Sequence, residues 1–166
     1  MRTLVAFLLA GCGASPAAAG ERPPACVGEP LFPGAACAAE IAREGAIVRL
    51  RDPECRRLLA DFSDASGHTL AQNLAAFGVS ADQYLERLPL LDGSEHGLCA
   101  CQQSQLLTTP GVRRILVCRS FLETVFRRRV MAEVYLIHEM LHTLGLGENP
   151  PSSHDITQRV IRRCAP

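Results

Sequence analysis

The spacing of apolar residues predicts that the first half of the domain is mostly helical. Apolar positions recur three and four residues apart, which is the period of one helix face. These segments span residues 36–45, 54–62 and 69–77. Pro53 suits the first turn of the second segment, and Gly78 ends the third. A fourth, short helix is expected after Ser80, which precedes Gln83 by three residues in a capping-box pattern.

Beyond this helical half the pattern becomes that of strands. A turn is expected over 89–93, and two apolar runs, 105–109 and 112–118, flank a Pro-Gly dipeptide. Runs of this kind on either side of a turn signal predict a β-hairpin, with residues 115–117 as a buried strand.

The longest predicted helix runs over 123–144 and is followed by a last helix over 152–163. The first carries an apolar stripe of Val130, Val134, Ile137, Leu141 and Leu144. Gly145 supplies its stop, because glycine enters the left-handed conformation without a steric cost. Ser152 or Ser153 caps the last helix, and Asp155 lies in its first turn. These elements predict a small α+β fold, mainly helical, with a β-hairpin or small sheet before the longest helix.

Composition narrows the class of protein. The chain has 166 residues, of which 48% are hydrophobic, and 17 basic side chains balance 17 acidic ones. This is enough apolar material for the core of one globular domain, and too much for a disordered chain. Because the net charge is zero, no electrostatic field attracts nucleic acid, and we expect no nucleic-acid partner.

The N-terminus resembles an export signal. A charged start, Met1-Arg2-Thr3, precedes the apolar run 4–10. The following Leu9-Ala10-Gly11-Cys12 resembles the lipobox of bacterial lipoproteins, in which the cysteine is lipidated and becomes the first residue. The alternative is an ordinary secretory signal cleaved near 17–19, and both interpretations export the protein.

The expected domain division follows from this signal. Residues 1–11 form the lipoprotein signal peptide, the Pro-, Ala- and Gly-rich 12–25 form a tether, and 26–166 form the domain. We expect a protein of the cell envelope, on the periplasmic side or the cell surface, that contacts the membrane through its N-terminal lipid. No later apolar run reaches membrane-spanning length.

The cysteine count supports an oxidising compartment. Eight cysteines are present, and if Cys12 carries lipid, seven remain for at most three disulfides and one leftover thiol. His96, Cys99 and Cys101 are also possible metal ligands by residue type. Disulfides are the favoured interpretation in an exported protein.

The strongest chemical signal is the sequence His138-Glu139-Met140-Leu141-His142 within the longest predicted helix. Residues four apart share one helix face, so both imidazoles can reach a single ion, with Glu139 beside them toward metal-bound water. The alternative is two surface histidines and a glutamate on an amphipathic helix. His68 and His96 have no such spacing, and we expect them on the surface.

This motif resembles that of the zincin metallopeptidases, and HEMLHTLGLGE is similar to the metzincin pattern H-E-x-x-H-x-x-G-x-x-H/D. In that pattern the glycine turns the chain so that the residue six after the second histidine becomes the third ligand. Here that residue is Glu148, and His154 and Asp155 are its rivals. Metzincins have a methionine downstream, and none follows Met140. The resemblance therefore implies a zincin-like domain outside the familiar metzincin families.

The resemblance implies a zinc-dependent peptidase acting on peptide or protein substrates. Zn²⁺ held by His138, His142 and Glu148 would keep a fourth position for water, and Glu139 would act as general base. Tyr135 and His154 are the candidate donors to the oxyanion. The strand over 112–118 is either the edge that pairs with substrate or an ordinary buried strand. The alternative function is a non-catalytic envelope lipoprotein with a structural or vestigial metal site that binds a partner.

Overall fold

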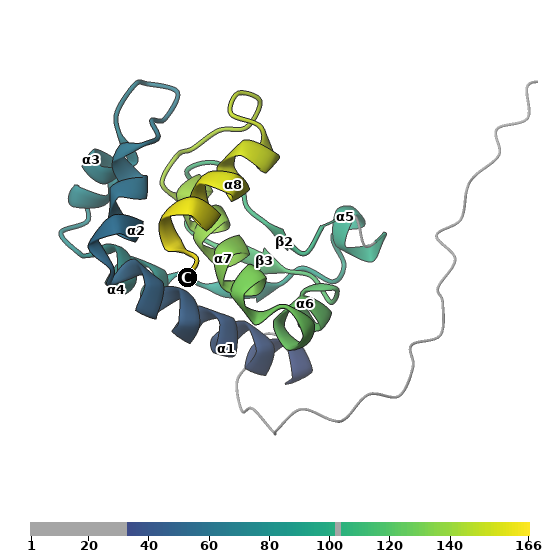
Figure 1. Ribbon diagram of the computed structural model, residues 1–166. Coiled ribbons are helices and arrows are strands. Elements are labelled where there is room, and N and C mark those ends of the chain that lie inside the picture. Colours follow the sequence, from purple (N-terminus) through teal and green to yellow (C-terminus); the bar gives the residue numbers. More distant parts are fainter. Residues whose placement is uncertain (1–32, 102–103) are drawn as a thin grey trace, which may run out of the picture.

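The computed structural model describes residues 33–101 and 104–166 (Figure 1). The signal peptide over 1–11, the tether over 12–25 and the lipidation site Cys12 lie outside the described residues, so these assignments stay predictions.

The helices of the first half form as predicted, with longer or shorter ends. They are α1 (Pro33–Leu50), α2 (Pro53–Arg57) with the 3-10 turn η1 (Leu58–Ala60), α3 (Leu70–Ala75) and α4 (Ala81–Arg87). Pro53 begins α2, and the side chain of Asp52 caps that helix by accepting a hydrogen bond from the Glu54 amide at 2.7 Å. The predicted capping box of Ser80 and Gln83 opens α4. The chain turns between α3 and α4 at Gly78, whose φ of 64° is a left-handed conformation that glycine adopts without a steric cost.

The buried face of α1 is made largely of alanine. Ala35, Ala38, Ala39, Ala42 and Ala46 have no exposed surface. Side chains this small let α1 approach α6 (Phe121–Arg127) and α7 (Arg129–Thr143) closely. Gly45 permits one further contact, because a Cβ there would overlap the buried carboxylate of Glu133.

A three-stranded sheet contains the predicted hairpin and one strand that was not predicted. The strands are β1 (Leu90–Asp92), β2 (Leu106–Leu107) and β3 (Ile115–Val117), in the order β1-β3-β2. Strand β2 pairs antiparallel with β3, which confirms the hairpin, whereas β1 pairs parallel with β3 where we expected only a turn over 89–93. Three residues are too short for an alternating pattern, so β1 depends on its distant partner.

The order of the strands decides between the two interpretations of the segment over 112–118. Strand β3 is the central strand and pairs on both sides, so it has no free edge to offer a substrate. The expectation of an edge strand there was wrong, and the ordinary buried strand is what forms. Strands β1 and β2 form the two edges of the sheet instead.

The longest predicted helix is divided into two. Its expected span of 123–144 breaks at Arg128, whose φ of −145° and ψ of 56° interrupt the helix between α6 and α7. Both helices pack against α1 and against each other, so the chain must bend between them. The predicted stop is confirmed, since α7 ends at Thr143 and Gly145 has a φ of 106°.

The last helix and two disulfides that join described residues stabilise the domain. Helix α8 (Ser153–Cys164) lies against α7, its C-terminal end comes down beside α1 in Figure 1, and Ser152 caps it through the amide of Asp155. One disulfide joins Cys55 to Cys164, and a second joins Cys99 of the short helix α5 (Gly97–Ala100) to Cys118. Cys99 is therefore not a metal ligand beside His96. The fold is α+β, mainly helical and supported by disulfides, as predicted. Within 33–101 and 104–166, no helix is both long and apolar enough to span a bilayer.

Candidate metal centre

The two histidines of the motif lie on one face of α7. His138 and His142 are each 4% exposed, and their Nε2 atoms are 3.0 Å apart. The spacing of four residues on a helix produces this approach, as the sequence predicted. The alternative of two surface histidines is not what the structure has, because both side chains are buried.

The other nitrogen of each imidazole has its own partner. His142 Nδ1 lies 2.7 Å from the carbonyl oxygen of Leu146 and donates to it. His138 Nδ1 lies 2.9 Å from the hydroxyl oxygen of Thr157 on α8. With the proton on Nδ1, each Nε2 presents its lone pair toward the other histidine, which is the tautomer that a metal requires.

Glu148 joins the two histidines from the turn after α7. Its Oε1 lies 3.6 Å from His138 Nε2 and 3.5 Å from His142 Nε2. The three residues form a group whose ligand atoms all lie within 4.8 Å of one another. The rival Asp155 is used elsewhere, because its carboxylate accepts a hydrogen bond from the Ser152 hydroxyl at 2.6 Å.

The three ligand atoms fit a zinc ion in number, type and spacing. A point equidistant from them lies about 2.0 Å from each, given the separations of 3.0, 3.5 and 3.6 Å. Zinc forms bonds of about 2.0–2.1 Å to imidazole nitrogen and about 2.0–2.2 Å to carboxylate oxygen. Two histidines with one glutamate are also a known ligand set of zinc enzymes.

Burial changes the pKa of two side chains at the centre, His138 and Glu139. It lowers the pKa of His138 to about 4, and repulsion from His142 adds to this effect. At neutral pH the His138 ring is therefore neutral and able to bind a metal. Burial also raises the pKa of Glu139. The nearby Thr108 hydroxyl lowers the pKa of Glu139 and so offsets part of this rise. The Thr108 oxygen does not reach the geometry of a complete hydrogen bond with any described residue.

Two adjoining cavities open onto the centre. One of about 310 Å³ includes Tyr135, His138 and Glu139 in its lining, and one of about 240 Å³ includes Glu139, His142 and Glu148. Glu139 therefore borders both cavities beside the ligand group. Tyr135 lines the first, as a donor to the oxyanion would. His154 is exposed on the first turn of α8 and is not among the residues that line either cavity.

Several residues around the centre had no signal in the sequence. Thr157 contacts His138 from α8, and Thr108 faces Glu139 from the end of β2. Ser104 and Ser153 line both cavities. Each comes from a segment remote from the motif, and hydroxyl side chains are common enough that no spacing distinguishes them.

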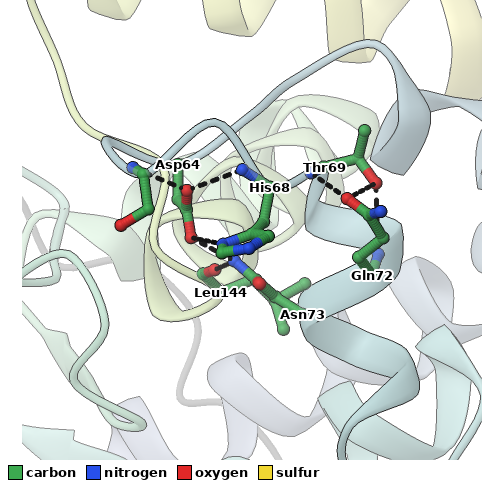
Figure 2. A network of polar contacts seen from close by, with 7 residues as sticks. Asp64, His68, Thr69, Gln72, Asn73 and Leu144 are labelled. Carbon is green, nitrogen blue, oxygen red and sulfur yellow. Dashed lines mark hydrogen bonds and ion pairs between the residues drawn. The ribbon is translucent and has the colours of Figure 1, made fainter.

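A polar network holds the C-terminal end of α7 in place (Figure 2). The Asn73 side chain donates 2.9 Å hydrogen bonds to the Leu144 carbonyl and to Asp64 Oδ2. Asp64 Oδ1 in turn accepts from the amides of Ser66 at 2.8 Å and His68 at 3.0 Å. Asn73 thus satisfies a carbonyl at the helix end, one residue before the turn that leads to Glu148. His68 is exposed, as expected.

No protein-family model, no curated protein and no solved structure matches the chain.

Proposed function

We propose that this protein is a zinc-dependent metallopeptidase. One observation carries the proposal. Glu139 lines both of the cavities onto which His138, His142 and Glu148 open, and no fourth ligand residue among the described residues joins that group. A structural zinc site normally uses four side chains, whereas a catalytic site uses three and leaves one position open.

The residues of the chain divide the chemistry between them. His138, His142 and Glu148 would hold the ion. A zinc ion in such a site supplies Lewis acidity and lowers the pKa of a water molecule at the open position toward neutrality. Glu139 would accept a proton from the attacking water and pass it to the leaving amine. Its raised pKa suits a group that must both take and release a proton.

The neighbouring groups would complete the site. Tyr135 is the better candidate donor to the oxyanion, because it borders the same cavity as Glu139, whereas His154 does not. The zincin resemblance implies a sheet edge beside an extended substrate. We assign that place to β2, since of the two edge strands it is the one whose residue Leu106 lines both cavities at the centre.

The central test is the substitution Glu139→Gln in the full chain. It preserves the size of the side chain but removes the base, so we expect about one zinc ion per chain to remain while peptide hydrolysis falls by about 10²–10⁴-fold. Zinc is measured by elemental analysis and hydrolysis with a mixed peptide library. Glu123→Gln is the matched control, because Glu123 is an exposed glutamate that pairs with Arg127.

The outcomes separate the proposal from its alternative. Unchanged hydrolysis in Glu139→Gln would contradict the mechanism. A native protein that binds zinc but cleaves nothing would favour a non-catalytic envelope lipoprotein with a structural metal site.

We also propose that the protein is exported and anchored through lipid on Cys12. The disulfides support an oxidising compartment, and the lipobox-like sequence supports the anchor. Mass spectrometry of the full chain from a membrane fraction should find lipid on Cys12, and Cys12→Ala should release the protein from that fraction. Recovery of unmodified native protein would contradict the anchor.

A further inference from the structure

A third cavity, of about 240 Å³, adjoins the candidate centre on the side of the hairpin turn. It includes Leu107 and Thr108, which also line the cavity of His142 and Glu148. Ser104 and Leu106 in turn line both cavities at the centre. Three cavities therefore lie one after another along β2. The candidate metal ligands line the first two.

The chemistry of the third cavity differs from that of the centre. Leu98 and Val112 line it, and these large apolar side chains are 43% and 37% exposed. Arg114 also lines it and is exposed, and no carboxylate belongs to its lining. Arg114 makes no ion pair within the part of the chain that the structure describes. The cavity next to it instead has Glu139 and Glu148.

The apolar wall of this cavity is held against the sheet. Leu98 belongs to α5, and the following residue, Cys99, forms a disulfide with Cys118 directly after β3. Val112 and Arg114 belong to the hairpin turn, which is fixed to α7 by a 2.9 Å hydrogen bond from the Gly111 amide to the His142 carbonyl. The cavity is therefore built on anchored segments.

We propose that this third cavity is a substrate subsite that selects a peptide segment with an apolar and an acidic residue two positions apart, because alternate side chains of an extended peptide lie on the same face. The inference rests on the proposed peptidase function and adds a preference to it. The apolar side chain would contact Leu98 and Val112, and the carboxylate would pair with Arg114. An extended peptide advances about 3.3 Å per residue, so one that crosses Thr108 would occupy both neighbouring cavities within a few residues.

The test compares peptide binding and cleavage by full-length proteins that differ at one arginine. The probes are two fluorescein-labelled pools of ten-residue peptides, random except for a central leucine that is followed two positions later by glutamate in one pool and by lysine in the other. Binding is measured by fluorescence anisotropy on the Glu139→Gln protein, where cleavage cannot interfere, and cleavage is measured on the protein with Glu139. Both measurements are repeated with Arg114→Glu.

We expect the glutamate pool to bind more tightly and to be cleaved faster, and Arg114→Glu to shift the ratio between the pools toward lysine by about tenfold. Arg113→Glu is the matched control. Its guanidinium lies 5.1 Å from the centre of the Phe77 ring and lines a different cavity, so the preference for glutamate should remain. Arg114→Gln, which removes the charge without reversing it, should give an intermediate ratio.

The two proposals fail in different ways. Zinc-dependent cleavage with the same pool ratio in native protein and Arg114→Glu would overturn the subsite and leave the peptidase in place. Binding that follows Arg114 without any cleavage would overturn the peptidase and leave the subsite. Native protein that neither distinguishes the pools nor cleaves them would overturn both.

Discussion

Thr157 shows how a single hydroxyl can prepare a ligand for metal. Its oxygen lies 2.9 Å from Nδ1 of His138, while Nε2 of the same ring faces His142. A group that accepts the Nδ1 proton fixes the tautomer and orientation of the ring and raises its basicity as a ligand. Thr157 would therefore be a positioning residue of the proposed metal site, since it would act on a bound ion through His138.

Replacing Thr157 with valine should weaken zinc binding by about 10–100-fold, because valine has the same shape but cannot accept the proton. Thr157→Ser keeps the hydroxyl and should restore most of the affinity. The affinity is measured by competition with a chromophoric chelator, and circular dichroism checks that each variant is folded. Equal affinities for the valine and native proteins would show that the hydroxyl has no such role.

At the scale of elements, α7 depends on segments distant in sequence to hold both of its ends. Near the start of the helix, the buried carboxylate of Glu133 accepts hydrogen bonds from Arg49 of α1 at 2.6 Å and from Arg129 at 3.2 Å. At its end, Asn73 donates to the Leu144 carbonyl and is itself held by Asp64 Oδ2, to which it also donates. The hydrogen bond from Asn73 is the largest cause of the lowered pKa of Asp64.

This lowered pKa predicts an acid dependence of stability. A carboxyl group with a lower pKa in the folded state stabilises the fold above its unfolded value, about 3.8, and loses that contribution as pH falls through the folded pKa. Asp64→Ala should therefore lower the melting temperature at pH 7, and its difference from native protein should shrink below about pH 3.8. Thermal melts between pH 2.5 and 7 measure this difference.

The substitution Asn73→Ala tests the uncharged amide of this network separately from the carboxylate of Asp64. It should cost about 1 kcal/mol of unfolding free energy at pH 7, through the lost hydrogen bond to Leu144, and should weaken the acid dependence. A difference between native and Asp64→Ala proteins that stays constant over the whole pH range would contradict the network.

At the scale of the whole molecule, the Cys55–Cys164 disulfide joins α2 of the first half to the last helix. It links α2 to the end of α8 across 109 residues of sequence, and Arg163 on α8 pairs with Asp61 at 3.0 Å. Helix α8 also contains Thr157, whose hydroxyl contacts His138 of α7. The disulfide therefore helps to keep this hydroxyl beside His138. The Cys99–Cys118 disulfide spans only 19 residues and holds α5 at the sheet.

The two loop lengths predict different losses of stability. A cross-link that closes about 100 residues restricts the unfolded chain by about 4.7 kcal/mol in the chain-entropy model, and one that closes about 15 residues by about 3 kcal/mol. Cys164→Ser should therefore reduce the free energy of unfolding more than Cys118→Ser does. Urea unfolding of the two variants under non-reducing conditions measures both losses, and the opposite order would contradict this account.

The sequence alone determined the elements whose signals are local. Apolar spacing predicted the helices of the first half and the last helix, and Gly145 predicted the end of α7. The motif placed His138 and His142 together because four residues are about one turn of any helix. Glu148 joined them six residues later, as the resemblance to zincins implied.

Only the tertiary structure decided the features that depend on contacts between distant segments. These include the parallel pairing of β1, the break at Arg128, the central place of β3, and the contacts of Thr157 and Thr108 with the motif. A periodic pattern records which side of an element is buried, but it does not record which partner buries it. The candidate ligands could therefore be named from the sequence, whereas the cavities and supporting hydroxyls around them depend on how β2, α7 and α8 pack.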